Sequence, residues 1–193
     1  MTHQIPVTPS RFSDRVLTLL ERVEYRRAET DADKQAIYRL RYDAYMREGA
    51  IAPNAERTFH DPFDRAANCW IIGMYIDGEL ASSIRLHVAS APDDPLPART
   101  VFADILDAEV RSGLTVVDPT RFVTRLDYSL RYPEMPYLTV RPGWMAGEYF
   151  HADCILATIR REHQAYYRRG FGHVPWCDPR EDPTLRKPIA RMG

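Results

Sequence analysis

The sequence is poor in lysine, in cysteine and in long apolar runs. Only two of its 26 basic residues are lysines, Lys34 and Lys187, and the others are arginines. The three cysteines, Cys69, Cys154 and Cys177, are odd in number and far apart, which fits neither a disulfide framework nor a zinc site. No apolar run reaches the roughly 18 residues that a membrane span requires, and no secretory signal opens the chain. We therefore expect a cytoplasmic protein without integral membrane association.

The charges almost cancel, giving a formal net charge of −1 over 193 residues. This balance argues against general binding of nucleic acid, which requires an excess of basic residues. The excess of arginine over lysine has two interpretations. It follows either from the codon usage of a GC-rich genome or from a need for planar forks that hold carboxylates or phosphates. The positions of the arginines have to decide between them.

Hydrophobic periodicity and turn residues predict an alternation of helices and strands. Thr30 and Asp33 have the spacing of a capping box, and Asp77-Gly78 is typical of a type I′ hairpin turn. Asp118-Pro119 interrupts a predicted strand and indicates a bulge or an edge. The predicted order is α-β-α-β-β-α-β-α-β-α over residues 11–21, 23–28, 31–47, 68–76, 79–88, 100–110, 114–124, 147–169, 171–177 and 184–192.

This order predicts one mixed α/β (α+β) domain with a central sheet and helices on both faces. The domain would span residues 1–193, with an N-terminal helix within 1–22 and the core from 23 to 193. Residues 48–63 are polar and irregular, and a loop of this length in a compact domain favours a binding site or a lid.

Several common site motifs are missing. The sequence contains no phosphate-binding P-loop, no dinucleotide fingerprint and no nucleophile elbow. Its histidines lack paired-ligand spacing, so we expect no metal site. Cys177 could serve as a nucleophile, although a buried free cysteine is the commoner outcome. Gly143 and Gly147 precede the predicted helix 147–169, where they would either expose backbone N–H groups to an anion or thioester, or be structural.

Charged residues at fixed spacing are more informative. Arg41 and Tyr45 are four residues apart and project from one face of a predicted helix. Acidic residues precede the hairpin, and Arg85 lies in its second strand. Such residues form either a partly buried salt-bridge network or a site that orients a charged substrate, and the two are compatible.

Four short motifs occur in an order and at intervals that are similar to a known enzyme group. They are Arg41-x-x-x-Tyr45, Asp61-x-Phe63-Asp64, Arg85-Leu86 and Asp118-x-x-Arg121-Phe122. With them the chain resembles the autoinducer-synthase branch of the GNAT-like acyltransferases from about residue 23 to residue 193. Within this branch it looks most like the long-chain N-acyl amino acid synthases, including N-acyltyrosine synthase. Residues 38–45 and the following Arg47-Glu48-Gly49 carry most of this closer likeness.

The resemblance implies a GNAT-like fold and the transfer of a long fatty acyl chain to the amine of an amino acid, with tyrosine favoured. The donor would be the thioester of acyl carrier protein, whose phosphopantetheine arm would lie where two central strands splay apart. No other cofactor would be bound. Such a site must hold the amine and the thioester carbonyl in position and stabilise the tetrahedral oxyanion.

Roles for individual residues follow from the same resemblance. Asp118 would accept the proton of the amine, and Arg121 would orient Asp118. Arg41 or Arg85 would meet the carboxylate of the acceptor. The other substrate-binding positions would be Tyr45, Asp61 and Asp64, together with Phe102, Phe122 and Trp144 in an apolar pocket for the acyl chain.

Carrier protein is acidic, so its docking surface should be basic. The predicted helix 147–169 carries a group of arginines, of which Arg161 and Arg168 are seven apart and share a face. This group is either a docking patch that steers the donor or an ordinary solvated helix surface. It consists of Arg160, Arg161, Arg168 and Arg169.

Departures from the family pattern restrict the expected reaction. Phe59 and Ile51 stand where autoinducer synthases have glutamate and tryptophan, which disfavours homoserine-lactone synthesis and suits another amine. The glycine-rich loop of acetyl-CoA-dependent enzymes is missing, because Arg168-Arg169-Gly170-Phe171-Gly172 follows a predicted helix instead of opening one. Two alternatives remain: an acetyl-CoA-dependent small-molecule N-acetyltransferase, and a non-catalytic lipid- or signal-binding module on the same fold.

Overall fold

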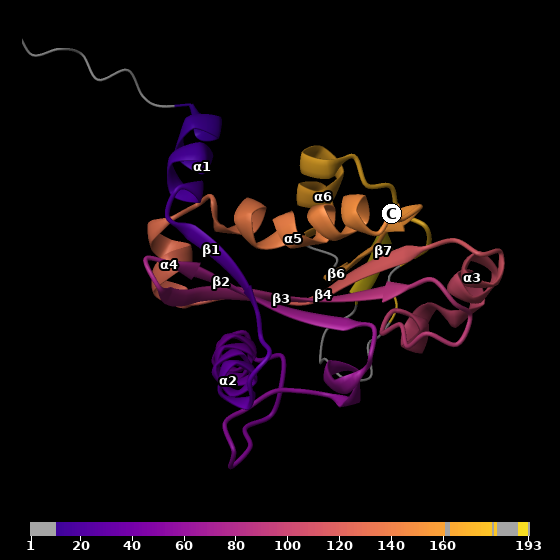
Figure 1. The fold of residues 1–193 in the computed structure, drawn as a ribbon, viewed down its shortest axis with the longest axis horizontal. Helices are drawn as coiled ribbons and strands as arrows, with labels where there is room; N and C mark the ends of the chain where they lie inside the picture. Colours follow the sequence, from indigo (N-terminus) through magenta and orange to yellow (C-terminus); the bar gives the residue numbers. More distant parts are fainter. Residues whose placement is uncertain (1–10, 161–162, 179, 181–188, 193) are drawn as a thin grey trace, which may run out of the picture.

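The computed structural model describes residues 11–160, 163–178, 180 and 189–192. It is a mixed α/β fold in which α5 and α6 lie on one side of a central sheet and α2 on the other (Figure 1). The predicted fold class is therefore confirmed. The elements are α1 (Phe12–Leu20), β1 (Val23–Arg27), α2 (Asp31–Arg47), the short 3₁₀ helix η1 (Pro62–Arg65), β2 (Cys69–Ile76), β3 (Glu79–Ala89), α3 (Arg99–Arg111), β4 (Val116–Thr124), α4 (Leu126–Arg131), α5 (Met135–Tyr149), β5 (Cys154–Ile155), β6 (Ala157–Arg160), α6 (Gln164–Phe171) and β7 (Ile189–Met192).

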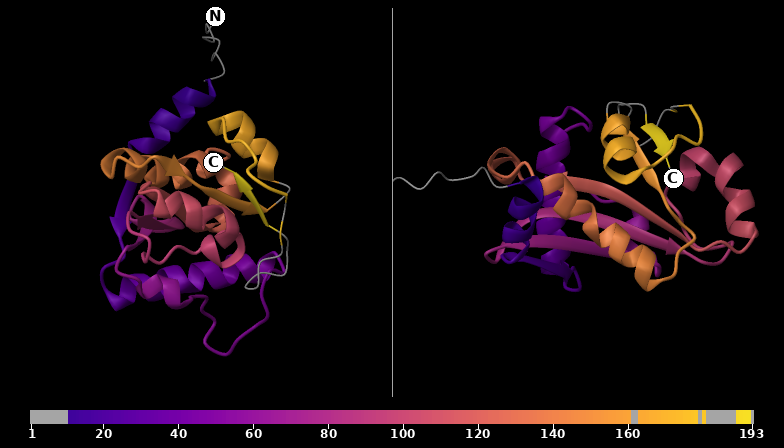
Figure 2. Two further views of the ribbon diagram at one scale, coloured as in Figure 1. Left: turned by 90° about the vertical axis from the view of Figure 1, so that its right-hand side faces the viewer. Right: turned by 90° about the horizontal axis from the view of Figure 1, so that it is seen from above.

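The main sheet has the strand order β1-β2-β3-β4-β5. The pairs β1–β2, β2–β3 and β3–β4 are antiparallel, and β5 runs parallel to β4. A second, two-stranded sheet pairs β6 with β7. Seen from two further directions, the main sheet is twisted, with α5 lying along one of its faces (Figure 2).

Local chemistry explains the elements before α3. Thr30 Oγ1 accepts the backbone N–H of Asp33 at 3.1 Å, and the carboxylate of Asp33 accepts the N–H of Thr30 at 3.2 Å, which completes the capping box of α2. Asp77 and Gly78 have φ values of 52° and 84°, and they join the directly paired residues Ile76 and Glu79. Positive φ at both central residues is the signature of a type I′ turn, so both local predictions are confirmed.

The interruption of β4 differs in position from the prediction. Asp118 and Pro119 pair regularly with His87 and Leu86 of β3. The shift in register comes later: Arg85 faces Thr120, whereas Ser83 faces Val123. The intervening Arg121 has a φ of 55°. An extra residue in one strand is a β-bulge, and it therefore lies at Arg121-Phe122 instead of Asp118-Pro119.

Pro119 limits the pairing of β4 with β5, on the side of β4 opposite β3. The carbonyls of Thr115 and Val117 accept backbone N–H groups of Asp153 and Leu156, each at 2.8 Å. Alternate residues of a strand direct their polar groups to the same side, so the nitrogen of Pro119 also faces β5. Proline has no N–H to donate, and the β4–β5 pairing ends at Val117. The predicted edge of β4 thus begins after Val117 on the β5 side, and β4 and β6 diverge from there.

The predicted helix 147–169 is wrong. The helix in this region is α5, which ends at Tyr149, and β5, β6 and α6 follow it. Pro136 lies in the first turn of α5, where proline is tolerated, and Pro142 is accommodated inside the helix. Packing outweighs the proline, because the α5 side chains Met135 and Leu138 are buried against β2 and β3.

Gly147 therefore ends a helix instead of beginning one. A Cβ atom on this residue would lie 2.5 Å from Cδ1 of Ile155, so the glycine allows α5 and β5 to approach closely. Of the two alternatives for Gly147, the anion-binding helix N-terminus is therefore excluded and the structural role holds.

Two further elements near the C-terminus differ from the prediction. Residues 171–177 do not form a strand, because α6 extends to Phe171 and is closed by Gly172 at a φ of 73°. The expected helix 184–192 falls mostly outside the described residues, and its end, Ile189–Met192, is the strand β7. No helix in the described ranges is long and apolar enough to cross a bilayer.

The segment between α2 and β2 is attached to the core by a buried ion pair. Arg41 Nη1 lies 2.8 Å from Asp64 Oδ1, and the two side chains are 0% and 1% exposed. Asp64 also caps η1 by accepting the backbone N–H of Asp61 at 2.9 Å. Burial raises the pKa of Asp64, but Arg41 and Arg85 more than offset this and hold it below its ordinary value. Asp64 is thus an ionised link between α2, η1 and β3.

We predict that Asp64→Ala lowers the free energy of unfolding by about 3–5 kcal/mol, because it leaves Arg41 buried without a counter-charge. Urea denaturation of the purified protein measures this change. The matched control is Asp43→Ala, which removes an exposed α2 carboxylate 3.8 Å from Arg57 and should change stability by less than about 1 kcal/mol. Equal effects of the two substitutions would show that the buried pair has no special role.

Candidate active site

A cavity of about 510 Å³ opens where β4 and β6 diverge. Its walls come from both faces of the sheet, with α2 and η1 on one side and α5 and α6 on the other. A volume of this size accommodates a small organic ligand. Its lining includes Tyr45, Arg47, Glu48, Asp61, Phe63, Arg85, Arg121, Phe122, Val140, Trp144, Tyr167, Phe171 and His173.

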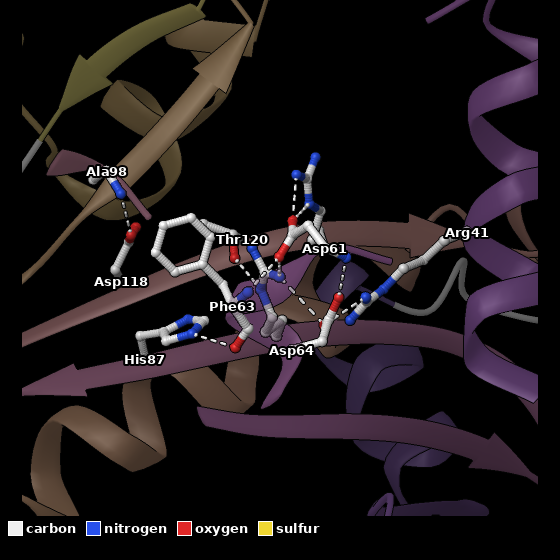
Figure 3. Close-up of polar contacts among 10 residues, drawn as sticks. Arg41, Asp61, Phe63, Asp64, His87, Ala98, Asp118 and Thr120 are labelled. Carbon is white, nitrogen blue, oxygen red and sulfur yellow. Dashed lines mark hydrogen bonds and ion pairs between the residues drawn. The ribbon is translucent and has the colours of Figure 1, made fainter. Parts of the chain in front are cut away.

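The wall on the α2 side is built around the carboxylate of Asp61 (Figure 3). Arg85 Nη1 lies 2.6 Å from one of its oxygens, and Arg121 Nη2 lies 2.7 Å from the other. The N–H of Phe63 donates to the same carboxylate at 3.0 Å. Burial raises the pKa of Asp61, but the two arginines outweigh it and bring the pKa to about 2. Asp61 is therefore ionised at neutral pH, but it is too weakly basic to be an effective general base there.

Arg121 is placed by the bulge of β4. Its guanidinium lies over the ring of Phe59, 4.8 Å from the centroid, and Tyr45 packs edge-on against the same ring. Burial lowers the pKa of Arg121, but Tyr45 and Asp61 raise it above its ordinary value. The positive φ of Arg121 is a strained conformation for this residue, and the contacts with Asp61 and Phe59 hold it in place.

His87 supports η1 from below and was not predicted from the sequence. Its Nε2–H donates to the carbonyl of Phe63 at 3.0 Å, and its ring lies edge-on to the ring of Phe63. Burial lowers the pKa of His87, with a further contribution from Arg85, to about 4. His87 is therefore neutral at physiological pH. A lone histidine in a strand carries no signal of such a role, because only tertiary structure brings it to Phe63.

The wall on the α5 side is apolar and aromatic. Trp144 lies 5.5 Å from Phe171 and 5.7 Å from His173, measured between ring centroids. Tyr167 lies 5.8 Å from Phe171. Val140 adds an aliphatic surface from α5. The two walls differ in chemistry, since one presents fixed charges and the other presents rings and aliphatic side chains.

The structure brings six of the predicted site residues to this cavity: Tyr45, Asp61, Arg85, Arg121, Phe122 and Trp144. Four others lie away from its walls. Arg41 and Asp64 form the buried pair between α2 and η1. Phe102 is fully buried in the core beneath α3, together with Leu106 and Val116, and does not line the cavity. The predicted contact of Phe102 with the acyl chain is therefore corrected.

Asp118 also lies outside the cavity lining. Its side chain is completely buried and accepts the backbone N–H of Ala98 at 2.9 Å, at the start of α3 (Figure 3). Because side chains alternate along β4, Asp118 faces α3, while Val117 and Pro119 face α5. This position suits a capping residue, and the predicted proton transfer to Asp118 lacks the geometry. Arg121 orients Asp61 instead.

The four arginines predicted as a docking patch do not share one helix. Arg168 and Arg169 are exposed near the C-terminal end of α6. Arg160 belongs to β6, and its side chain and Arg161 lie outside the described part of the chain. The predicted long helix that would have carried them is wrong, because β6 and α6 occupy its described part.

The N-terminus of α5 lacks the features of a diphosphate site. Its N-cap is Glu134, whose buried carboxylate lies 2.6 Å from Arg15 of α1. A carboxylate at the N-cap, engaged with Arg15, offers no hydrogen-bond donor to a bound anion. Gly170 and Gly172 lie at the C-terminal end of α6, as the sequence predicted. Among the described residues, no three His, Cys, Asp or Glu side chains are grouped to hold a metal ion.

The sequence profile of one family, described as N-acyl amino acid synthase FeeM, matches residues 36–193. No curated protein sequence matches the chain. Among solved structures, FeeM from uncultured soil microbes aligns with a TM-score of 0.72 and 18% identity over 89% of each chain.

Two other solved structures share the fold. An acyl-CoA N-acyltransferase from Pseudomonas aeruginosa has a TM-score of 0.60 and 18% identity over 88% of this chain and 97% of its own. The AHL synthase LasI has a TM-score of 0.60 and 14% identity over 88% of each chain. The fold is therefore that of the GNAT-like acyltransferases. Because the family profile covers residues 36–193, the chain belongs to the FeeM family of N-acyl amino acid synthases and is an N-acyltransferase.

Proposed function

We propose that this enzyme transfers a long fatty acyl chain from acyl carrier protein to the amine of an amino acid, with tyrosine as the preferred acceptor. One observation carries the proposal: a single cavity has a charged wall on one face of the sheet and an aromatic, aliphatic wall on the other. The charged wall suits a zwitterionic acceptor, and the apolar wall suits an acyl chain. The likeness of residues 38–49 to N-acyltyrosine synthases favours tyrosine.

The chemistry requires little from side chains. The amine nitrogen attacks the thioester carbonyl, the C–N bond forms, the C–S bond breaks, and the thiolate leaves. The acceptor ammonium releases one proton to solvent before attack, and the nitrogen of the tetrahedral intermediate loses a second, which the departing thiolate takes up to become a thiol. The enzyme contributes by holding the two substrates together and by stabilising the oxyanion with N–H donors. The bulge at Arg121-Phe122 interrupts regular pairing beside the cavity, which supports it as the source of such donors.

Acyl carrier protein is a better candidate for the donor than coenzyme A. The two donors share the phosphopantetheine arm, but only coenzyme A brings a nucleotide diphosphate, and the N-terminus of α5 carries the buried Glu134. A carrier protein is acidic and needs basic residues near the cavity. Arg168 and Arg169 are exposed on α6, and the same helix lines the cavity with Tyr167 and Phe171.

Cells that overexpress the enzyme should accumulate a long-chain N-acyltyrosine, detected by mass spectrometry of lipid extracts. Arg121→Ala should abolish the product, because Asp61 loses one of its two guanidinium partners and the charged wall is disturbed. Arg39→Ala is the control, since Arg39 is exposed on α2 and does not line the cavity. Circular dichroism must show that Arg121→Ala is folded. Extracts that contain no new acylated amino acid would contradict the proposed function.

Charge reversal at Arg168 and Arg169 should raise the KM for acyl carrier protein several-fold and leave the KM for the amino acid unchanged, because α6 would then repel the acidic donor. Steady-state kinetics with purified acyl carrier protein measure both constants. Arg39→Glu, on α2 at the opposite side of the sheet, provides the same charge change as either single reversal, Arg168→Glu or Arg169→Glu. An unchanged donor KM would refute the docking surface, and faster turnover with acyl-CoA would refute the carrier protein as donor.

Val140→Phe should shift the products toward shorter acyl chains, because the larger ring occupies part of the apolar wall. The measurement is the product distribution from a mixture of acyl donors of different lengths. The variant must melt at the wild-type temperature for the comparison to hold. A folded variant with an unchanged distribution would place the acyl chain elsewhere.

A further inference from the structure

His173 is a buried ionisable side chain on the apolar wall of the cavity. It follows α6 and is only 6% exposed. Its ring stands edge-on to the rings of Trp144, Tyr167 and Phe171, with centroids 5.7, 5.7 and 6.2 Å away. Its Nδ1 is buried, and no hydrogen bond to the described part of the chain satisfies this atom. Such a nitrogen is costly in a wall that merely packs, and in a cavity wall it indicates a group that serves a ligand.

Two observations place His173 where β4 separates from β5. The carbonyl of Ile155 lies close enough to the imidazole to raise its pKa, and Ile155 forms the last pair of the β4–β5 ladder. Trp144, which contacts the imidazole ring, directly follows Gly143. A Cβ atom on Gly143 would lie 3.2 Å from Cγ of Pro119, so α5 packs closely on β4 at this point. The imidazole therefore lies at the start of the gap between the strands.

The surroundings of His173 keep its imidazole neutral at physiological pH. Burial lowers the pKa of His173 below the ordinary value of 6.5, and the nearby carbonyls of Phe171 and Ile155 offset this only in part. Among the described rings that contact it, from α5 and α6, only Tyr167 titrates, and burial raises the pKa of Tyr167 to about 12. A neutral imidazole has a basic nitrogen and an N–H group, so it can take up a proton and pass one on.

Other acid–base groups of the lining are less suited to moving a proton inside the cavity. Asp61 has a pKa of about 2 and is held by two arginines. Glu48 and His163 are exposed, at the ends of α2 and α6. A group that serves the reacting atoms has to lie beside them and have a pKa not far from the working pH. His173 combines a buried position with such a pKa.

We propose that His173 is a catalytic residue that carries a proton from the acceptor nitrogen to the departing sulfur. The proposal deepens the proposed function and rests on it. When the C–N bond has formed, the nitrogen of the tetrahedral intermediate is positively charged, and His173 accepts one of its protons. The C–S bond then breaks, and the imidazolium gives this proton to the thiolate, which leaves as a thiol. The imidazole returns to its neutral form, so the step consumes no further reactant.

The first test is the variant His173→Asn, which keeps a polar side chain that cannot carry a proton. With purified enzyme, tyrosine and acyl carrier protein thioester, it should lower kcat by about 10²- to 10⁴-fold, the usual contribution of general acid–base catalysis. Both KM values should stay nearly unchanged. The matched control is His151→Asn, at an exposed position outside the cavity lining whose φ of 51° suits asparagine. It should behave as the wild type.

The pH dependence separates catalysis from packing. The acceptor ammonium must lose a proton in every variant, so log(kcat/KM) should rise with pH at a slope of about one in acid solution. In the wild type a second ionisation adds to this: below the pKa of His173, which lies under 6.5, a protonated imidazole cannot accept a proton. The wild-type slope should therefore approach about two at acid pH, and in His173→Asn it should stay near one.

Imidazole in solution gives a further test. His173→Gly leaves a space beside Trp144 that a free imidazole molecule can occupy. Added imidazole should restore part of the kcat of His173→Gly in a saturable way. It should have no effect on the wild type or on His151→Asn.

The possible outcomes separate the two proposals. A wild-type enzyme that acylates no amino acid refutes the proposed function. An active wild type whose kcat is unchanged in a folded His173→Asn variant refutes the proton transfer alone. A lower kcat that imidazole does not restore in folded His173→Gly would assign His173 to packing and also refute it. If neither variant folds, the wild-type profile decides, and a slope that stays near one below pH 6.5 refutes the proposal.

Discussion

Charge compensation inside the protein determines where the chain after α2 can lie. Asp61 and Asp64 enter the core beside β3, and each does so only because arginine neutralises it: Arg41 from α2, Arg85 from β3 and Arg121 from β4. Buried ion pairs contribute little net stability, since desolvation cancels much of their attraction, but a displaced partner is very costly. The network therefore specifies one position of η1 against the sheet, and this position forms the charged wall of the cavity.

Two backbone features of β4 make room for that cavity. Pro119 removes a donor on the β5 side and ends the parallel pairing, while the bulge at Arg121-Phe122 changes the direction of side chains on the β3 side. Without the bulge, strict alternation would turn Arg121 away from Asp61, since Thr120 already faces Arg85. One strand thus opens the sheet and supplies a charged side chain to the opening.

Features with local causes could be predicted from the sequence, whereas features that depend on tertiary packing could not. The capping box at Thr30 and the turn at Asp77-Gly78 depend on neighbouring residues, and both were predicted correctly. The motif spacing also predicted Asp61, Arg85 and Arg121 as site residues, and all three line the cavity. It could not show that Asp118 faces α3, because strand register decides the direction of that side chain. The position of helix α5 was predicted wrongly, because the burial of Met135 and Leu138 that stabilises it depends on tertiary structure.

The cavity has walls from both faces of the sheet, and this has a consequence for the order of the reaction. Under the proposed function the acceptor lies against the wall on one face and the acyl chain against the wall on the other, so both can be resident when the acyl group moves. Direct transfer between two bound molecules needs no acyl-enzyme intermediate, and the corresponding kinetic mechanism is sequential instead of ping-pong. Under the proposed function, the gap beside Pro119 thus lets the acyl group pass directly between the two substrates.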